Sequence, residues 1–370
     1  MFIKQQFKRP FTWVITIFLI VFAGSVLFTY HNDHAYKMTI GEITHVKHIK
    51  TTDVRDDYHN HDVKHHDKLT IKIKNGKFEN QTTTVDNTYA ASKADTDEYK
   101  ANERVFLHID DDLDHAYITE KKRDTVVVVI TGLFLLSLLI VGRGVGLQSI
   151  LSLILNTGAV MVAIAIHNHY SGVNLFFLMS CAIIVATVLT LLLVTGFTTR
   201  TLVTIVGTLL GTFLCVGIAA IVIHYTEGRG IKYETLNFLT LPPKDVFLAS
   251  VLVGTLGAVM DVAITMSSGM HEIFMRAPHI TMKRWARAGR NIGQDIMGTM
   301  TNILLFSYLA GSLPILLVFL KNSNTLTYTI SMNWSLEIAR AITGGIGIVL
   351  TIPITIALMQ LWAKWGGAKS

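Results

Sequence analysis

The chain has 370 residues, of which 51% are hydrophobic and only 16% are charged, and its mean hydropathy is +0.45. An ordinary globular chain carries about 25% charged residues. Its apolar residues come in long runs that need a bilayer rather than a soluble core. These features exclude a soluble enzyme, a secreted disulfide scaffold and a disordered chain. They predict an α-helical polytopic membrane protein.

Eight predominantly apolar runs are each near the roughly 20 residues that cross a bilayer. They are Phe11–Tyr30, Thr125–Val141, Ile150–Ile166, Asn174–Val194, Leu202–His224, Val246–Ser268, Ile296–Leu320 and Leu336–Trp362. The second and third are short, and Pro353 predicts a tilt or kink in the last. We expect the first run to be an uncleaved membrane anchor, with a cleaved signal peptide as the alternative.

The basic residues of the short loops set the expected orientation. One set of loops holds 12 Lys and Arg residues and the other holds 4. The larger set is Lys4, Lys8, Arg9, Arg143, Arg200, Arg276, Lys283, Arg284, Arg287, Arg290, Lys364 and Lys369. This asymmetry predicts two cytoplasmic termini and a bacterial plasma membrane location. It also accounts for most of the basic pI of 9.1, so no nucleic-acid partner is expected.

Residues 31–124 differ in composition from the rest, with 15 Lys and Arg, 19 Asp and Glu, and 10 of the 15 histidines. Alternating stretches and an Asn75-Gly76 turn signal predict a small β-rich domain, a barrel or an OB-like fold, outside the cytoplasm. The expected strands are Met38–Val46, Lys68–Lys74, Lys77–Val85, Arg104–Ile109 and Ala116–Thr119. The segment separates the anchor (1–30) from a seven-helix transmembrane domain (125–370). It is where we expect contact with a second copy or an envelope partner, if there is one.

Four histidines lie close together in Tyr58–Lys68: His59, His61, His65 and His66. We interpret this stretch as a solvated polar loop between strands. A metal site or a pH-sensing role is the alternative, because imidazole is both a metal ligand and titratable near neutral pH. No metal and no cofactor are otherwise expected.

Asp261 lies deep in the sixth apolar run, roughly 22 Å from its outer end at about 1.5 Å per residue. An ionisable group at that depth is costly unless it faces protein or water. Its spacing to three further polar residues places all four on one helix face. They are Asp261, Thr265, Ser268 and Glu272. A second polar stripe follows on the next helix, formed by Asn291, Asp295, Gly298 and Asn302 and flanked by Gln294, Thr299 and Thr301.

The two stripes are predicted to meet in the inner half of the membrane, because small residues border both and allow close helix approach. These residues are Gly254, Gly257, Ala258, Gly293 and Gly298. The alternative is structural: the acids hydrogen-bond between helices, or Asp295 caps a helix that begins near it.

Two further features lie outside the stripes. The basic stretch Arg276–Arg290, with Trp285, predicts an amphipathic helix on the cytoplasmic membrane surface. Glu337 and Arg340 have the spacing of a helical ion pair near the outer interface.

At these residues the chain resembles the YibE/F-like membrane proteins. The resemblance is carried by Gly257–Thr265, Ser268–Ile273 and Gly289–Asn302, and in the outer segment by Asn75–Lys77, Val85–Tyr89 and Asn102–Val105. Ala101-Asn102-Glu103 stands where a Gly-Asp dipeptide is more usual in the family. The resemblance implies an integral membrane protein and no particular biochemical activity.

Gly257, Asp261 and Ile264, with Glu272 beyond them, are similar to the proton-carrying helix of the RND and SecDF transporters. Here, however, the acid falls in the sixth run rather than the fourth, and the outer domain is smaller. We therefore predict a transporter- or permease-like protein in which Asp261 responds to protons or ions. The rival is a non-transporting component whose outer domain binds a partner, a lipid or an envelope polymer. The apolar runs contain neither a zinc-binding motif nor a nucleophile motif, so no enzymatic activity is expected.

Overall fold

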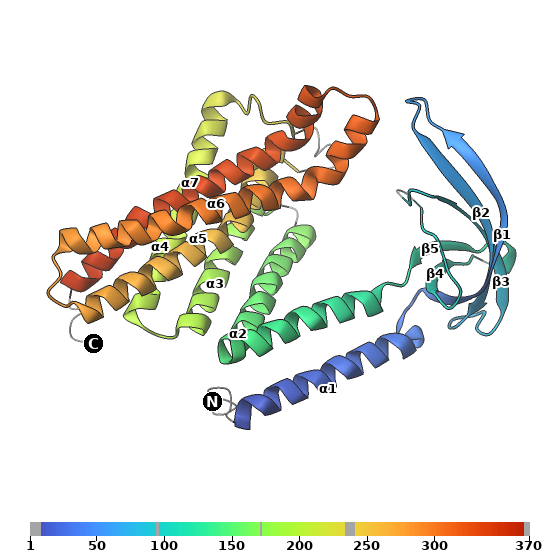
Figure 1. Cartoon of the computed structure of the whole chain (residues 1–370), viewed down its shortest axis with the longest axis horizontal. Helices are drawn as coiled ribbons and strands as arrows, with labels where there is room; N and C mark the ends of the chain where they lie inside the picture. The colour runs from blue at the N-terminus through green and yellow to red at the C-terminus, as the bar shows by residue number, and fades with distance from the viewer. Residues whose placement is uncertain (1–8, 94–95, 111, 171, 234–240, 366–370) are drawn as a thin grey trace, which may run out of the picture. The chain divides into compact units, whose positions relative to one another are not determined.

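The structure, a computed structural model, describes residues 9–93, 96–110, 112–170, 172–233 and 241–365 (Figure 1). Lys4, Lys8 and Lys369, which entered the predicted charge asymmetry, lie outside the described residues. The chain divides into two compact units, Met1–Leu147 and Gln148–Ser370. The division falls inside helix α2 (Asp124–His169).

The first unit contains helix α1 (Arg9–His31) and a five-stranded antiparallel sheet. The strands are β1 (Thr39–Arg55), β2 (His61–Ile73), β3 (Thr82–Ala90), β4 (Arg104–His108) and β5 (Tyr117–Lys121), in the order β3-β2-β1-β4-β5. Alternate residues of the strands form its core, including the fully buried Ile43, Leu69, Ile71 and Val105. The small β-rich domain predicted from alternation is therefore present.

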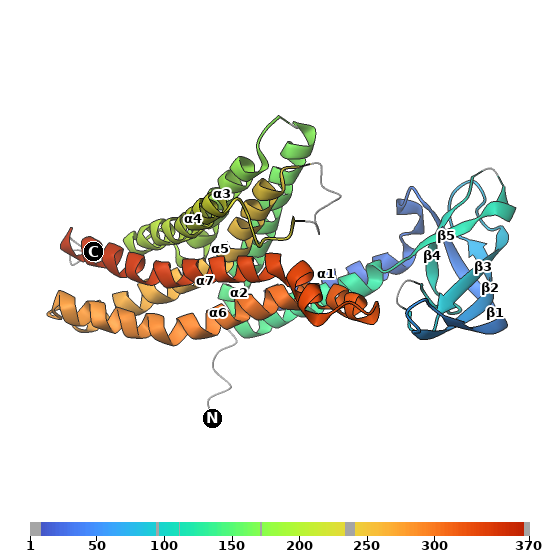
Figure 2. The same ribbon diagram turned by 90° about the horizontal axis from the view of Figure 1, so that it is seen from above.

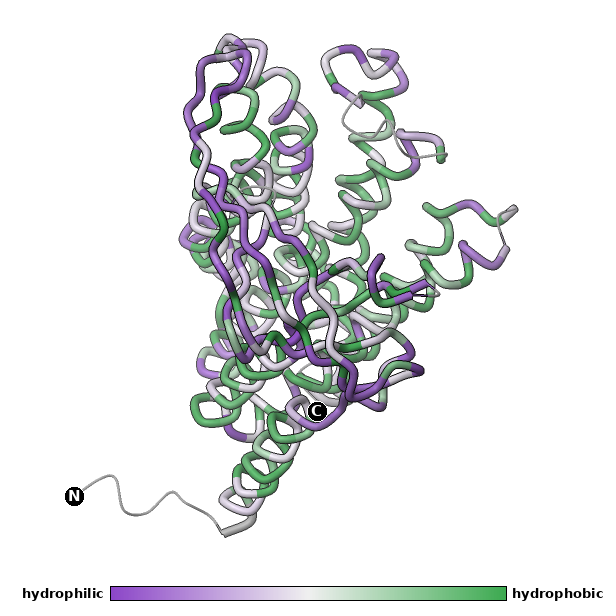
Figure 3. Tube along the Cα trace, turned by 90° about the vertical axis from the view of Figure 1, so that its right-hand side faces the viewer, coloured by the Kyte–Doolittle hydropathy of each residue, from purple (hydrophilic) through white to green (hydrophobic). Residues whose placement is uncertain are grey.

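The hairpin between β1 and β2 is longer than predicted. The prediction that the histidine-rich stretch Tyr58–Lys68 forms a loop is wrong. His61, His65 and His66 lie in β2, where they pair with Arg55, Thr51 and Lys50 of β1. Only His59 lies in the turn, with a φ of 64°. Both faces of this arm are polar, so its sequence lacks the alternation that identifies a strand. Figure 3 shows that hydrophilic residues predominate along it.

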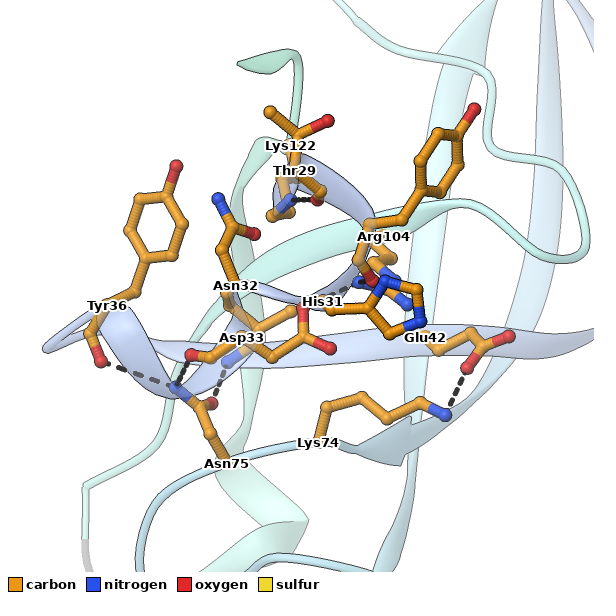
Figure 4. Close-up of polar contacts among 12 residues, drawn as sticks. Thr29, His31, Asn32, Asp33, Tyr36, Glu42, Lys74, Asn75, Arg104 and Lys122 are labelled. Carbon is orange, nitrogen blue, oxygen red and sulfur yellow. Dashed lines mark hydrogen bonds and ion pairs between the residues drawn. The ribbon is translucent and has the colours of Figure 1, made fainter. Parts of the chain in front are cut away.

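The tight hairpin predicted at Asn75-Gly76 is also wrong, because β2 ends at Ile73 and β3 begins only at Thr82. Gly76 has a φ of 87°, which favours glycine. The Asn75 side chain turns inward instead. Its amide nitrogen donates to the carbonyl of Asp33 at 2.7 Å, and its oxygen accepts from the backbone N–H of Ile40 at 2.6 Å (Figure 4).

A polar network joins α1, the sheet and the start of α2. The Lys122 ammonium donates to the carbonyl of Thr29 at 2.6 Å and pairs with Asp124 at 2.8 Å, and its side chain is only 2% exposed. Arg104 donates to the carbonyl of Tyr30 at 2.5 Å and pairs with Asp33 at 2.8 Å (Figure 4). Two cations thus bind the last carbonyls of α1, where a helix offers unpaired acceptors and partial negative charge.

Tyr36 belongs to the same network, since its hydroxyl donates to Asp124 at 3.1 Å. Burial and the neighbouring Asp124 carboxylate raise the pKa of Tyr36. The phenol therefore stays protonated and remains a donor at neutral pH.

The second unit is helical (Figures 1 and 2). Its helices are α3 (Leu175–Thr195), α4 (Thr199–Thr226), α5 (Pro243–Arg276), α6 (Met282–Lys321) and α7 (Leu326–Lys364), preceded by the end of α2. Helix α5 lies at the centre, with Val251, Leu252, Val259 and Val262 fully buried. With α1 and α2, the described residues include seven helices long and apolar enough to cross a membrane.

Eight spans were predicted, and the second and third both fall within the 46 residues of α2. The backbone leaves helical geometry at Arg143, where φ is 50° and ψ is −122°. At about 1.5 Å per residue, each part of α2 is long enough to cross a bilayer alone. Two short runs with three glycines between them are therefore joined by a sharp break rather than by a loop.

The surface helix predicted for Arg276–Arg290 is wrong. Helix α6 begins at Met282, is capped by the Thr281 hydroxyl, and continues without interruption to Lys321. Trp285 is fully buried, and its indole nitrogen donates to the carbonyl of Met270 at 2.9 Å. The basic residues of this first part of α6 stay exposed on the opposite face.

Candidate functional site

Helices α5 and α6 form an antiparallel pair, and three contacts set their relative level. A Cβ atom added to Gly254 would lie 1.8 Å from the Tyr308 hydroxyl, and one added to Gly269 would lie 2.9 Å from Ile292. The Trp285–Met270 hydrogen bond fixes the other end of the pair. Asp261 lies about midway between Gly254 and Gly269, so it stands at the level of Thr299 and its neighbours.

The predicted small residues play different parts. Gly254 does receive a side chain of α6, as predicted from its size. Gly293 instead packs against Ile352 of α7, where an added Cβ would lie 2.6 Å away. Gly257 and Gly298 have open space beside them.

Both predicted polar stripes lie on exposed helix faces. Exposed are Asp261, Thr265 and Glu272 on α5, and Asn291, Asp295, Thr299 and Asn302 on α6, while Ser268 is half-buried. Within the described chain, no hydrogen bond or ion pair connects one stripe to the other. Glu272 pairs with Arg276 of its own helix at 2.6 Å, and Thr299 donates to the carbonyl of Ile296 at 2.9 Å. The stripes therefore share one level of the helix pair without polar contact between them.

Neither structural alternative describes the acids. Asp295 lies well inside α6, far from the cap at Thr281, so it does not cap a helix. The side chain of α5 that forms a hydrogen bond to α4 is Ser267, whose hydroxyl lies 2.7 Å from that of Thr204. Ser267 is buried, whereas Asp261 and Asp295 point away from the packed side of their helices.

A cavity between α6 and α7 was not predicted from the sequence. It measures about 440 Å³ and is open on one side. Its lining comprises Ser307, Tyr308, Gly311, Ser312 and Ile315 of α6 and Asn333, Leu336 and Glu337 of α7. The sequence does show polar residues in the two neighbouring apolar runs that form α6 and α7. It does not show that these residues come together, so the cavity is recognisable only in the structure.

The predicted ion pair of Glu337 and Arg340 borders this cavity. Arg340 donates to Glu337 at 2.7 Å and to the hydroxyl of Ser250 on α5 at 3.0 Å, and its guanidinium lies 5.9 Å from the centre of the Phe247 ring. Neither partner is more than a fifth exposed. Arg340 is thus held on the α5 side, and Glu337 is the acidic side chain that lines the cavity.

The histidines of the β1–β2 arm form a hydrogen-bonded group across three strands. His48 lies 2.7 Å from the buried carboxylate of Asp67, and His65 stacks on Tyr89 with ring centres 5.0 Å apart. Burial and the Asp67 carboxylate raise the pKa of Tyr89. Among the described residues, no three His, Cys, Asp or Glu side chains are close enough together to hold a metal ion.

A small antiparallel β domain followed by long apolar helices defines a polytopic membrane protein with an inserted β domain. The family described as YibE/F-like protein matches residues 130–365, and the YibE/F family N-terminal domain matches residues 34–121. The chain therefore belongs to the YibE/F-like family, in agreement with the resemblance found in its sequence. Neither a curated protein nor a solved structure gives a significant match.

Proposed function

We propose that this protein is transporter- or permease-like, that the exposed polar residues of α5 and α6 line a groove, and that Asp261 is the proton- or ion-responsive group of this groove. The observation that supports this is that seven polar residues are exposed along adjoining parts of the two helices, from Asp261 to Glu272 on α5 and from Asn291 to Asn302 on α6. In hydrocarbon, an exposed carboxylate costs several kcal/mol, so such a face needs water or a polar partner. Thr265 lies one helical turn from Asp261, and Thr299 lies one turn from Asp295, so polar groups accompany both carboxylates along the exposed faces.

The topology that accompanies this proposal has eight spans. Helix α2 counts as two spans joined at Arg143, both termini lie in the cytoplasm, and the β domain lies outside a bacterial plasma membrane. The basic residues exposed at the start of α6 then lie on the cytoplasmic side, in keeping with the excess of Lys and Arg there. The polar residues of the proposed groove extend toward the same side, because Glu272 and Asn291 lie nearest the ends of α5 and α6 that this topology places in the cytoplasm.

Cysteine labelling tests whether the groove holds water. Thr265→Cys, in a protein lacking Cys181 and Cys215, is expected to react with a hydrophilic maleimide at least ten times faster than Leu210→Cys. Leu210 is 47% exposed on an apolar face of α4, so its thiol would be surrounded by lipid. Both rates are measured in membrane vesicles, relative to the same protein unfolded.

The labelling rate of the Thr265→Cys thiol also tests whether the proposed groove responds to protons. The relative labelling rate of Thr265→Cys is expected to change between acidic and neutral pH, and Asp261→Asn is expected to remove the change. Equal protection of Thr265→Cys and Leu210→Cys would show that water does not reach the groove, and the proposed site would then be wrong.

A second candidate function rests on the β domain. The OB-like fold expected for this domain binds oligomers on its sheet face and loops, and the five antiparallel strands in the order β3-β2-β1-β4-β5 support this proposal. The turn Leu113–His115 comes close to β3, because the Thr83 hydroxyl donates to the carbonyl of Leu113 at 2.7 Å. The protein would then be a non-transporting component that binds a partner, a lipid or an envelope polymer through this domain.

Shortening the β1–β2 arm distinguishes the two functions. Replacing residues 48–66 with a tight turn retains the core residues Ile43, Leu69 and Ile71, so the domain is expected to fold. A strain without the protein is complemented with this variant and with Asp261→Asn. Loss of function only in the shortened variant would favour the binding role, and loss only in Asp261→Asn would favour transport.

A further inference from the structure

We propose that the cavity between α6 and α7 binds a small organic cation, a primary ammonium on a short apolar chain. Three kinds of group line it: a carboxylate, polar atoms without partners, and apolar walls. Binding there does not require transport through the α5–α6 groove, so it is tested separately from the proposed function.

The unpartnered atoms define what the ligand must offer. Asn333 is 5% exposed, and its amide nitrogen donates to the carbonyl of Thr329 at 3.0 Å, while its amide oxygen is buried and accepts no hydrogen bond. The hydroxyl of Tyr308 is also buried without a partner, but it packs against Gly254 of α5. A buried polar atom without a hydrogen bond is costly, so a ligand that donates to the Asn333 oxygen gains affinity.

The charge of the lining selects a cation. Glu337 is the only acidic or basic residue among those that line the cavity. One of its carboxylate oxygens pairs with Arg340, and the other accepts none of the described hydrogen bonds. Arg340 is held away from the cavity by Ser250 and Phe247. An anion would therefore meet a carboxylate and the acceptor atom of Asn333, whereas an ammonium can donate to both.

The size and walls of the cavity favour an organic ion over a bare metal ion. About 440 Å³ is far larger than one monovalent ion requires. Ile315 and Leu336 supply apolar surface, and Gly311 leaves one wall open. Pro314 also has no N–H to donate to the carbonyl of Ala310, which removes one helical hydrogen bond beside these residues.

Three probes of similar size separate charge, hydrogen bonding and apolar contact. Butylammonium, 1-butanol and tetramethylammonium are titrated into the full-length protein in lipid nanodiscs, with binding followed by saturation-transfer NMR. We expect butylammonium to bind at least ten times more tightly than either of the others, because 1-butanol lacks the charge and tetramethylammonium lacks N–H donors. Equal binding of butylammonium and 1-butanol would overturn the assignment.

Two substitutions locate the binding. Gly311→Leu is expected to abolish it, since a Cβ atom there meets nothing within 4 Å and the longer side chain fills the cavity. Gly217→Leu on α4, where the space is equally open, is the control and should bind as before. Binding that survives Gly311→Leu would place the ligand elsewhere and overturn the proposal.

Asn333→Leu tests the hydrogen bond without filling the open wall. Butylammonium binding is expected to weaken about tenfold, while the weak binding of 1-butanol stays the same. If both are unchanged, Asn333 does not contact the ligand and the assigned site is wrong.

Discussion

Lys122→Met is expected to destabilise the packing of the β domain on α1 and α2 by about 3–5 kcal/mol, because it leaves Asp124 without its cation. The Lys122 side chain is 2% exposed and that of Asp124 is 19% exposed. Water can therefore solvate little of the Asp124 carboxylate once its cation is removed. The carbonyl of Thr29 loses its donor as well. Hydrogen exchange followed by mass spectrometry should show faster exchange at the end of α1 and the start of α2.

Lys121→Met is the matched control. Lys121 is the last residue of β5 and directly precedes Lys122, but its pair with Glu103 at 2.6 Å leaves both side chains about a quarter exposed. A pair of this kind contributes roughly 0–1 kcal/mol. Similar exchange in the two variants would show that the buried network does not hold the domain to the helices.

The sequence was sufficient to predict the elements that depend on local composition. Apolar runs identified the helices, since a span must be apolar along its whole length. Alternation identified the strands that form the sheet core, such as the predicted Lys68–Lys74, which overlaps the second half of β2 up to Ile73. It could not identify the outer part of β2, because His61–Asp67 is polar on both faces and its strand conformation depends on pairing with β1 and β3.

Contacts between distant residues explain most of the errors. Asn75 follows a strand and precedes a glycine, which favours a tight turn, yet its side chain binds the carbonyl of Asp33, far earlier in the chain. The polar residues of α6 and α7 were visible singly, but nothing local shows that Tyr308 and Asn333 line one cavity. Periodicity placed Asp261 on a polar face, and the structure adds that this face is exposed.

Trp285 is another residue whose position depends on contacts that the local sequence does not show. Five basic residues nearby in the sequence favour a helix on the membrane surface, where tryptophan is common. The structure places the ring inside the protein instead, 5.0 Å from the ring centre of Phe274 and hydrogen-bonded to Met270. The adjacent Gly289 leaves room for Met270, whose sulfur would lie 2.8 Å from an added Cβ atom.

Trp285→Ala is therefore expected to destabilise the helical unit by about 3–5 kcal/mol, the usual cost of removing a large buried ring. Trp285→Phe should cost less, because it keeps most of the apolar contact and loses the hydrogen bond, worth roughly 1 kcal/mol. The buried thiol of Cys215 reports unfolding through its reaction with a fluorogenic maleimide during heating, in a Cys181→Ala background. Arg284→Ala, an exposed neighbour, is the control and should melt as the parent does.

The same substitution connects stability to the proposed groove. The Trp285–Met270 hydrogen bond lies at one end of the α5–α6 pair, and the Gly254–Tyr308 contact lies toward the other. Loosening the first is expected to change the level at which Asp261 stands beside Thr299, and so to alter the labelling of Thr265→Cys below the melting temperature. A Trp285→Ala protein that melts normally and labels normally would show that this end of the pair does not position the groove.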